Sequence, residues 1–389
     1  MKKAVIITPF DSYSYNVRIK YVVNYLKEFN YDSTILTSDF DHRKKEAYSV
    51  NRKNTTLLKT LRYSKNISIK RIMSHVMLAK SVYDELQRLK PDLIYCSGPP
   101  NSLYFFATKY KKKNPQVQLI SEVGDMWPET LPISSSKKKI LLPILHFWGN
   151  IRNKNLNNSD IVIFECQLFE ERLKKYLLPS QSQVIYLSKE DFFTKTNYWT
   201  FDSTEFKKIV KVIYIGALNN IVDIDIIVSF LKQLNKYRRV ELHLIGGGER
   251  ESELIEKAQL NNITLINHGI VYDDFQKQKI IKGSHFALNI MKDNVVVGAT
   301  MKSLEYFHWG IPVINNLPYD SQAMIEKYSC GFNINNDNIK KVSQKISEMT
   351  TDNLEKMAQQ SRLVYLENFD EKVVHSKFTK LLKHINATK

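Results

Sequence analysis

The sequence of 389 residues is poor in cysteine, glycine and proline, and each scarcity excludes a class of protein. Its three cysteines, Cys96, Cys166 and Cys330, form neither a disulfide framework nor a C-x-x-C ligand pair. This argues against a secreted disulfide scaffold and against a structural zinc site. With only 12 glycines and 11 prolines, and no low-complexity tract, the chain is neither collagen-like nor largely disordered.

Long apolar runs are also missing. Residues 4–7 give only four apolar residues before Thr8 and Pro9, too few for a signal peptide, and no run reaches the ~20 residues of a membrane span. We therefore expect a cytoplasmic protein. Its 43% apolar and 25% charged residues are typical of a globular chain, and its length suits two domains.

The positive charge of the chain is concentrated in its first half, and the second half is nearly balanced. Residues 1–190 hold 31 Lys and Arg against 17 Asp and Glu, whereas residues 191–389 hold 26 against 23. Within residues 43–71 there are ten basic residues and one acid, Glu46. Such asymmetry indicates an acidic partner, a nucleic acid or an anionic membrane surface, with a solvated face as the alternative. No zinc-finger spacing or RNP-type motif is present, so no nucleic-acid partner is expected.

A second basic segment favours the membrane surface. Residues 134–149 read SSSKKKILLPILHFWG, which places three lysines before an apolar run that ends in an aromatic pair. This composition is typical of a helix in the headgroup layer, and a buried helix with a solvated basic end is the alternative. The expected membrane residues are Lys137, Lys138, Lys139, Phe147 and Trp148.

Short apolar runs alternate with amphipathic stretches in two series along the chain. The first series places strands near residues 4–8, 33–37, 92–96, 117–123, 160–165 and 183–187, with helices at 17–29, 72–88, 102–112 and 168–176. The second places strands near residues 211–215, 240–245, 263–266, 286–290 and 311–315, with helices at 221–235, 249–260, 272–281 and 301–308. This alternation predicts βαβ units with parallel sheets.

The two series predict an α/β protein with two doubly wound Rossmann-like domains that face each other across a cleft. Residues 191–209 are the expected linker between a first domain, 1–190, and a second, 210–352. A helical stretch within residues 353–389 is expected to cross back to the first domain. Ligands of such sheets bind outside the carboxyl ends of the strands, so the cleft is the expected site.

Two kinds of motif lie at the predicted strand ends. Gly216 and the run 246–248 follow strands, where glycine lets backbone N–H groups approach a phosphate, although ordinary tight turns are the alternative. Residues 298–314 read GATMKSLEYFHWGIPVI, which predicts a helix with Lys302 and Glu305 on one face. A carboxylate there suits the hydroxyls of a ribose, and a lysine beside a helix N-terminus suits a diphosphate. A surface ion pair is the alternative.

This stretch resembles the nucleotide-sugar-binding segment of the retaining family 4 glycosyltransferases, which have the GT-B fold. The family pattern K-x-x-E-Y-x-x-x-G-x-P-V-I matches residues 302–314. Residues 263–271 and 244–248 are similar to its V-x-F-x-G-x-V and L-x-I-x-G-x-G stretches. Residues 90–94 and 125–129 resemble K-P-D-x-I and D-x-W-P-E of the bacterial polysaccharide enzymes. The resemblance covers nearly the whole chain.

The resemblance implies roles for particular residues. Glu305 would bind the ribose, Lys302 and the Gly216 loop would bind the diphosphate, and Asp125 would orient the acceptor hydroxyl or take its proton. Lys302 and Asp125 are thus the expected catalytic residues, with loop capping as the alternative for Asp125. The expected donor site comprises Gly216, Asn219, Gly246, Gly247, His268, Ile270, Thr300, Met301, Lys302 and Glu305. On the acceptor side we expect Ser14, Arg18, Asp125 and Glu129, with a helix-surface salt bridge as the alternative for Arg18.

The sequence departs from the family pattern at three places, one of which is the first loop, residues 10–16, where the usual paired glycines are missing. Val297 stands where many members have a first glutamate, and Asn219 and Asn220 stand where many have Arg and Lys. No carboxylate pair follows a phosphate loop, because Asp273 and Asp274 open a helix. Since positive charge and a helix dipole suffice to stabilise a pyrophosphate leaving group, we expect neither a metal nor another cofactor.

The resemblance therefore predicts a retaining glycosyltransferase. It would move a hexosyl or N-acetylhexosaminyl group from a nucleotide-diphosphate sugar, with a UDP-sugar favoured, to a lipid-linked saccharide. We expect this at the cytoplasmic membrane face, with peripheral attachment to anionic lipid, in the synthesis of a capsule or exopolysaccharide. A nucleotide-sugar 2-epimerase and a non-catalytic GT-B-like binding subunit are the alternatives, and an oligomer is left open.

Overall fold

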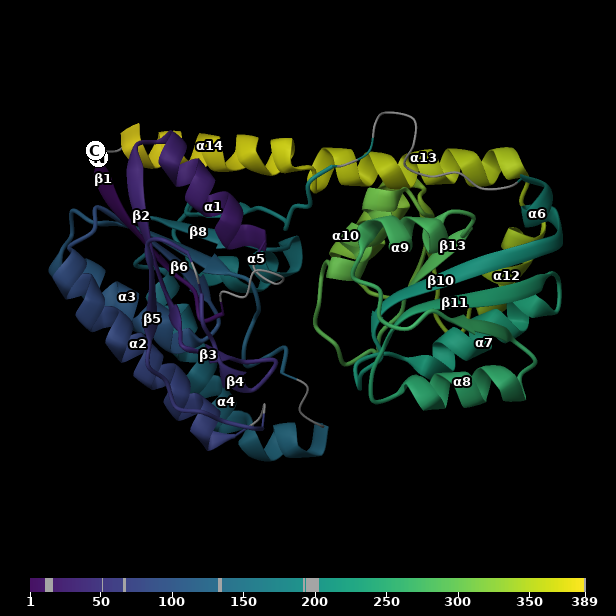
Figure 1. Ribbon diagram of the computed structural model, residues 1–389, viewed down its shortest axis with the longest axis horizontal. Coiled ribbons are helices and arrows are strands. Elements are labelled where there is room, and N and C mark those ends of the chain that lie inside the picture. Colours follow the sequence, from purple (N-terminus) through teal and green to yellow (C-terminus); the bar gives the residue numbers. More distant parts are fainter. Residues whose placement is uncertain are drawn as a thin grey trace. The chain divides into compact units, whose positions relative to one another are not determined.

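The computed structural model describes residues 1–10, 17–50, 52–65, 68–131, 135–191, 193 and 203–387 (Figure 1). Among these, the side chains of residues 17, 135–138 and 203–204 are not described. The chain divides into two compact units, of which unit 1 is Met1–Ser188 with Val374–Lys389 and unit 2 is Lys189–Val373.

Unit 1 is built on a parallel seven-stranded sheet in the order β5-β2-β1-β6-β7-β8-β9. The order runs outward in both directions from β1 and β6, which makes the unit doubly wound with its switch point between these strands. The central strands are buried on both faces, as in other parallel sheets covered by helices. The strands are β1 (Lys2–Ile7), β2 (Tyr31–Ser38), β5 (Thr55–Leu58), β6 (Leu93–Gly98), β7 (Gln118–Val123), β8 (Ile161–Phe164) and β9 (Ser182–Val184).

Helices cover both faces of this sheet (Figure 1). On one face the core joins the first helix to the last, because Val22 and Leu26 pack in one cluster with Phe378 and Leu382. A two-stranded antiparallel pair, β3 (Phe40–Asp41) and β4 (Glu46–Ala47), lies apart from the sheet. The helices are α1 (Val17–Glu28), α2 (Ile69–Leu89), α3 (Asn101–Lys113), α4 (Ser135–Leu156), α5 (Gln167–Leu173), the 3-10 turn η1 (Lys174–Tyr176) and α14 (Glu371–Ala387).

Unit 2 repeats the architecture with a parallel six-stranded sheet in the order β12-β11-β10-β13-β14-β15. Its switch point lies between β10 and β13. The strands are β10 (Ile209–Ala217), β11 (Arg239–Gly247), β12 (Thr264–Asn267), β13 (Phe286–Asn289), β14 (Val313–Asn315) and β15 (Gly331–Asn333). The helices are α6 (Ser203–Lys208), α7 (Ile224–Asn235), α8 (Glu251–Leu260), α9 (Asp274–Ile281), α10 (Met301–Trp309), α11 (Asp320–Tyr328), α12 (Ile339–Ser347) and α13 (Thr351–Asn368).

The structure confirms the predicted fold class, an α/β protein with two Rossmann-like units. Other details differ from the sequence expectations. The expected linker 191–209 includes α6, and β3, β4, β5, α11, β15 and α12 were not predicted. The expected C-terminal helices are α13 and α14, separated at Phe369 and Asp370. Helix α13 belongs to unit 2, whereas the side chains of α14 from Val374 onward pack in the core of unit 1.

Candidate functional site

The glycine loops of unit 2 are shaped by backbone packed on backbone. Gly246 has φ +136°, and a Cβ atom there would lie 2.1 Å from the carbonyl oxygen of Gly216. Gly248 has φ +150°, and its Cβ would lie 2.4 Å from the carbonyl oxygen of Leu218. Only glycine fits these two positions, so tight packing of the loops after β10 and β11 accounts for both residues. Gly247 belongs to the same turn, where its carbonyl oxygen accepts the N–H of Leu218 (2.9 Å).

Helix α10 begins and ends at residues that suit a helix terminus. Thr300 is the N-cap, its hydroxyl accepts the N–H of Ser303 at 2.9 Å, and the two side chains form a reciprocal capping box. Gly310 ends the helix at φ 69°. Because α10 follows β13, its N-terminus and partial positive charge lie at the switch point of the sheet.

A ladder of three asparagines, two of them fully buried, holds the N-terminus of α10 against the sheet. Asn289, the last residue of β13, donates its amide to Ser303 Oγ (3.1 Å) and accepts from the Thr300 hydroxyl (3.2 Å). It also donates to Asn315 Oδ1 at 2.8 Å, and Asn315 in turn donates to Asn333 Oδ1 at 2.8 Å. The final residues of three adjacent strands are therefore linked to the cap of the helix. The sequence analysis missed this ladder, although three short strands that each end in asparagine were a signal.

Lys302 lies over the carboxyl end of β10. Its Nζ is 2.5 Å from the hydroxyl of Tyr214 and 4.4 Å from the centre of that ring. A Cβ atom at Gly216 would lie 3.1 Å from Lys302 Cε, so the glycine leaves room for the lysine stem. Burial lowers the pKa of Lys302 to about 8. Lys302 thus lies beside the Gly216 loop, and the binding of a diphosphate by both stays a prediction.

Glu305 lies one turn further along α10 and takes part in a cluster of four charges. Its Oε2 accepts from Lys189 Nζ at 2.8 Å, and its Oε1 accepts from Trp309 Nε1 at 3.0 Å. Lys277 Nζ lies 3.6 Å from Oε1 and 2.6 Å from Asp274, while Lys189 Nζ lies 3.8 Å from Asp274. The side chain of Glu305 keeps 16% of its surface exposed. We call Lys189, Lys277, Asp274 and Glu305 the charged quartet.

The other expected donor residues lie at or near the same edge of the sheet. Asn219 turns back on its own loop and accepts the N–H of Ile221 at 3.2 Å. His268, which follows β12, is hydrogen-bonded to His243, with His268 Nε2 at 3.0 Å from His243 Nδ1. Ile270 and Met301 are exposed, with 66% and 55% of their surfaces accessible. The loop before Ile270 lies beside β11, because Gly246 donates its N–H to the carbonyl of Gly269 (2.8 Å).

In unit 1, Asp125 caps the loop that follows β7. Its Oδ1 accepts the N–H of Met126 at 2.7 Å, and its Oδ2 accepts from Trp127 Nε1 at 2.8 Å. Burial raises the pKa of this carboxyl group. Both oxygens thus cap the loop, as in the capping alternative, and the catalytic role of Asp125 stays a prediction.

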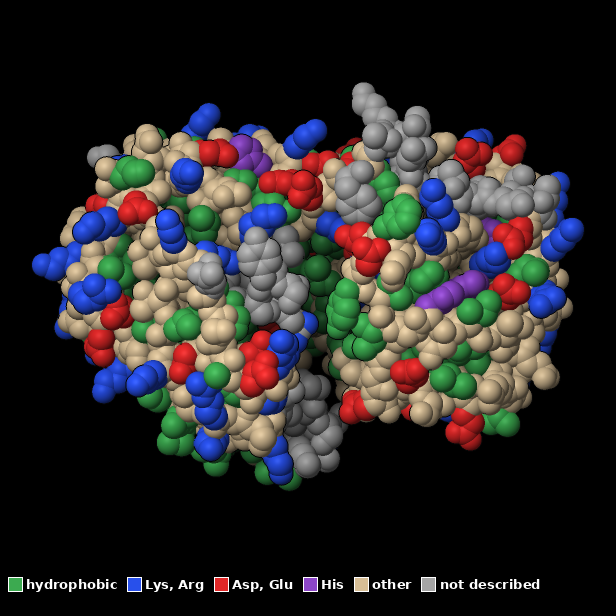
Figure 2. Space-filling model, viewed as in Figure 1, with side chains coloured by type: hydrophobic (Ala, Val, Ile, Leu, Met, Phe, Trp, Pro, Cys, Tyr) green, Lys and Arg blue, Asp and Glu red, His purple; other side chains and the backbone are tan. Residues whose placement is uncertain are grey.

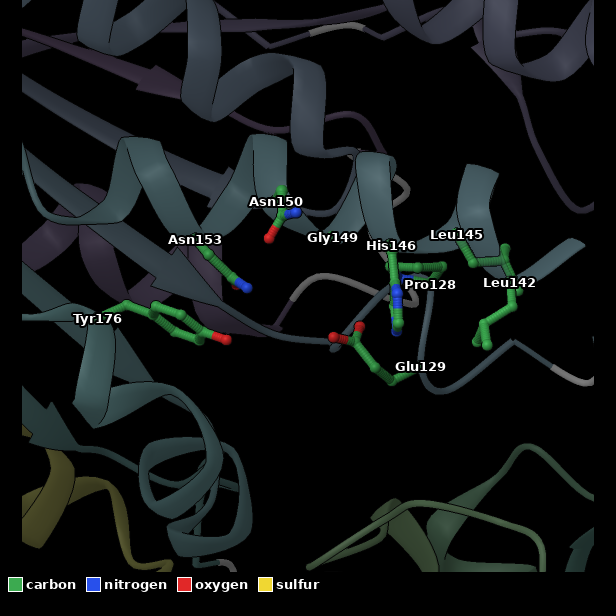
Figure 3. Close-up of a pocket in the computed structure, with 9 residues that line it drawn as sticks. All are labelled: Pro128, Glu129, Leu142, Leu145, His146, Gly149, Asn150, Asn153 and Tyr176. Atoms are coloured by element: carbon green, nitrogen blue, oxygen red, sulfur yellow. The ribbon is translucent and has the colours of Figure 1, made fainter.

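Glu129 forms a bidentate ion pair with the fully buried guanidinium of Arg152, at 2.8 and 2.9 Å. It also lines a cavity of about 400 Å³ in unit 1, a volume within the range of small-molecule sites (Figure 3). Polar side chains point into this space from α4, η1 and the loop after β7. The lining residues are Pro128, Glu129, Leu142, Leu145, His146, Gly149, Asn150, Asn153 and Tyr176.

Arg18, another expected acceptor residue, does not line this cavity. Arg18 is buried and pairs with Glu122 at 2.7 Å, so its salt bridge is an interior one rather than the helix-surface one that was the alternative to an acceptor-side role. Its guanidinium also donates to the carbonyl of Ile185. Ser14 lies outside the described residues.

The expected membrane segment forms α4, with the basic residues at its start. Lys139 is exposed and Phe147 has 70% of its surface accessible, whereas Trp148 turns inward and contacts Trp127 with ring centres 6.1 Å apart. The side chains of Lys137 and Lys138 lie outside the described residues. Among the helices whose residues are described, none is long and apolar enough to cross a bilayer. The described part of the chain also contains no cluster of three or more His, Cys, Asp or Glu side chains suited to a metal ion.

Comparison with known proteins agrees with the architecture of both units. Solved structures of the GT-B fold align over nearly the whole chain, at identities that bear on the fold alone. HepE from Anabaena, in complex with UDP and glucose, is 12% identical with a TM-score of 0.64 over 99% of this chain and 100% of its own. Sucrose-phosphate synthase from Thermosynechococcus elongatus is 12% identical with a TM-score of 0.71 over 100% of both chains. The lipopolysaccharide outer core galactosyltransferase WaaB, in its apo form, is 15% identical with a TM-score of 0.69 over 99% of both.

Residues 210–352 match the family model described as glycosyl transferases group 1. These residues contain the glycine loops, the asparagine ladder and α10. No sequence among the curated proteins matches the chain. The group 1 domain and the GT-B fold together confirm the predicted class of enzyme, a glycosyltransferase.

Proposed function

We propose that this glycosyltransferase is a retaining, family 4 enzyme that transfers a sugar from a UDP-sugar to a lipid-linked saccharide during the synthesis of a surface polysaccharide. One observation carries the proposal: Lys302 and Glu305 lie on the helix that follows β13, at the switch point of the group 1 domain. Ligands of doubly wound sheets bind at that point.

The donor would lie along the carboxyl edge of β10, β11 and β13. Its diphosphate would meet Lys302 and the N-terminus of α10, which supply a full and a partial positive charge. Its ribose would meet Glu305, and the exposed Ile270 offers an apolar surface for the base. UDP and UDP-glucose are bound in the HepE structures that share this fold, which supports a uridine nucleotide.

The transfer needs stabilisation of a leaving group rather than an enzyme nucleophile. As the bond between the sugar C1 and the diphosphate breaks, negative charge grows on the phosphate oxygen, where the Lys302 ammonium stabilises it. The acceptor oxygen forms the new bond to C1 on the same face and its proton passes to the departing phosphate. The net stereochemistry is retention. Asp125 would orient the acceptor, and we propose that no metal takes part.

The cavity of unit 1 suits the saccharide part of an acceptor. Glu129, His146, Asn150, Asn153 and Tyr176 provide hydrogen-bonding groups for hydroxyls around a space of about 400 Å³. Three of these residues, His146, Asn150 and Asn153, belong to α4 and follow one another at spacings of four and three residues, so they occupy one face of that helix.

Another face of α4 suits a membrane surface. Ile140, Ile144 and Phe147 are exposed at spacings of four and three residues. Exposed apolar residues also follow one face of α2, and Ile72 of α2 lines a small pocket together with Trp148 of α4, so the two helices are neighbours. Figure 2 shows apolar side chains at this margin of unit 1, with basic ones around them. The exposed residues of α2 are Ile69, Ile72, Met73, Val76 and Met77.

The charge of these helices fits an anionic lipid surface. Helices α3 and α4 contain no Asp or Glu, and α2 contains none before Asp84, whereas all three carry lysines. A lipid-linked acceptor would be reached from such a surface. We therefore propose peripheral attachment through α2 and α4 at the cytoplasmic face of the membrane.

Transfer of radiolabel from a panel of nucleotide sugars to a lipid-extracted acceptor tests the proposal. We expect a labelled lipid-linked product in the presence of EDTA, with a new linkage of the same anomeric configuration as the donor by NMR. A sugar epimer or free nucleotide without product would indicate the epimerase instead. Binding without turnover would indicate a binding subunit.

Glu305→Ala tests the donor site directly. We expect it to abolish UDP binding by calorimetry while the melting temperature stays within a few degrees of the parent value. Glu256→Ala is the matched control, because Glu256 is exposed on α8 in the same unit. Equal UDP affinity in Glu305→Ala and the parent protein would refute the ribose assignment.

A further inference from the structure

The two oxygens of Glu305 each receive one hydrogen bond from the protein. Lys189 Nζ donates to Oε2 at 2.8 Å and Trp309 Nε1 donates to Oε1 at 3.0 Å. The ammonium of Lys277 forms a longer ion pair with Oε1, at 3.6 Å, and lies closer to Asp274, at 2.6 Å. An ionised carboxylate has about four acceptor positions, two on each oxygen. Each oxygen therefore has one position that takes no hydrogen bond within 3.5 Å and is open to a ligand, on a side chain that is partly exposed.

A vicinal diol matches these two open positions, because it presents two O–H donors on adjacent carbons. We propose that Lys189 and Trp309 are positioning residues that orient the Glu305 carboxylate toward the 2′- and 3′-hydroxyls of a ribonucleotide, and so set the preference of the site for ribose over 2′-deoxyribose. This inference rests on the proposed donor site. It assigns a function to one residue of the charged quartet and to a tryptophan that the sequence analysis did not single out.

Both donors have fixed positions. Trp309 is fully buried and stands four residues after Glu305, on the same face of α10. Lys189 comes from outside the helix, and its backbone is held at both ends: its N–H donates to the carbonyl of Phe369 (3.3 Å) and its carbonyl accepts from the Tyr365 hydroxyl (2.6 Å). The carboxylate is thus held by one group on its own helix, Trp309, and by one from outside it, Lys189.

Fixing the carboxylate has a consequence for selectivity. A freely rotating carboxylate would turn to make the best hydrogen bond with a single hydroxyl. A carboxylate that is hydrogen-bonded to Lys189 and Trp309 keeps its two open acceptor positions in fixed directions. It therefore forms both hydrogen bonds only with a ligand that has two suitably placed hydroxyls. A 2′-deoxynucleotide leaves one oxygen unfilled in a site that excludes part of the solvent, so discrimination of about tenfold or more is expected.

Calorimetric titrations with UDP, GDP and their 2′-deoxy counterparts test the inference. For the parent protein we expect a preference of about tenfold or more for the ribonucleotide. Lys189→Met and Trp309→Phe should bring this ratio close to one, mainly by weakening the ribonucleotide. Lys189→Arg, which keeps a cationic donor, should restore most of the preference. Lys279→Met is the charge-matched control on α9, where Lys279 is exposed and lies over the Phe275 ring.

The outcomes separate this inference from the proposed function. The ribose assignment itself would be overturned if the parent protein bound none of these nucleotides, or bound the ribonucleotides and the 2′-deoxyribonucleotides equally well. A parent preference that persists in both Lys189→Met and Trp309→Phe would overturn only the positioning role. If Trp309→Phe is unfolded by circular dichroism, the ratio in Lys189→Met against that in Lys189→Arg decides the question.

Discussion

Lys302 places its ammonium nitrogen 2.5 Å from the hydroxyl oxygen of Tyr214 and 4.4 Å from the centre of the tyrosine ring. The two residues are 88 positions apart in the chain, on α10 and β10. Burial lowers the pKa of Lys302 to about 8 and raises the pKa of Tyr214. As the pH rises through 8, the lysine therefore loses its proton while the phenol stays protonated. The charge available to a diphosphate therefore depends on pH.

The affinity for UDP should fall as pH rises above 8. The diphosphate binds preferentially to the protonated form of Lys302. Each pH unit above the pKa that Lys302 has in the ligand-free protein should therefore weaken the binding of UDP up to about tenfold. Below about pH 7 the affinity should level off. Calorimetry between pH 6.5 and 9.5 measures this. Lys302→Arg should remove the fall because arginine stays charged, and a fall of the same size in that variant would contradict the assignment.

The asparagine ladder should contribute to both stability and binding. Asn315→Ala removes the acceptor of the Asn289 amide N–H, at 2.8 Å, and the donor to the Leu317 carbonyl, at 2.7 Å. We expect a loss of about 2–4 kcal/mol in the free energy of unfolding, measured with urea, because buried polar groups lose their partners.

The same substitution should weaken UDP binding, since the ladder ends at the cap of α10. Asn353→Ala, at an exposed position near the start of α13, is the control and should change neither quantity. An Asn315→Ala protein with parental stability would show that the ladder is not a structural support.

Glu165 should make unit 1 less stable as pH rises. Burial and the neighbouring Glu122 raise the pKa of Glu165 to about 8, from 4.5 when unfolded. The folded state therefore binds the proton more tightly, and the stability from this group is complete below pH 4.5 and is lost as pH rises to 8. Glu165→Gln should raise the melting temperature at pH 8.5 by several degrees and change it little at pH 4.5. Glu171→Gln, exposed on α5, is the control, and a pH-independent effect of Glu165→Gln would contradict the prediction.

Attachment to anionic vesicles should depend on both the lysines and the apolar faces of α2 and α4. Replacing Lys137, Lys138 and Lys139 by Gln should reduce sedimentation with phosphatidylglycerol vesicles several-fold at low salt, because each lysine near such a surface contributes about 1 kcal/mol. Replacing Ile72, Met73 and Val76 by Ser should reduce it at all salt concentrations, since apolar insertion is not screened.

The control for this experiment is a triple change to Gln at Lys340, Lys341 and Lys345, which are exposed on α12 of unit 2. It removes the same charge from a helix without an exposed apolar face. Equal sedimentation of all variants with the parent protein would exclude α2 and α4 as the membrane surface.

Much of the fold could be predicted from sequence because its signals are local. Most strands and helices follow from runs of apolar residues and helical spacing, as at β10 and α7, where the predicted and observed elements overlap. The elements between Asp320 and Ser347 were missed, since β15 has only three residues and none of them is fully buried. Such a strand forms through pairing with β14 rather than through its own composition.

The sequence by itself determined the two βαβ series, the basic first half and the helix that carries Lys302 and Glu305, because periodicity and charge are properties of neighbouring residues. Only the tertiary structure decided which remote groups surround those two side chains. Lys189 lies 116 residues from Glu305, and the partners in the asparagine ladder come from three strands. Strand order and register bring such groups together, and neither can be read from the composition of any one segment.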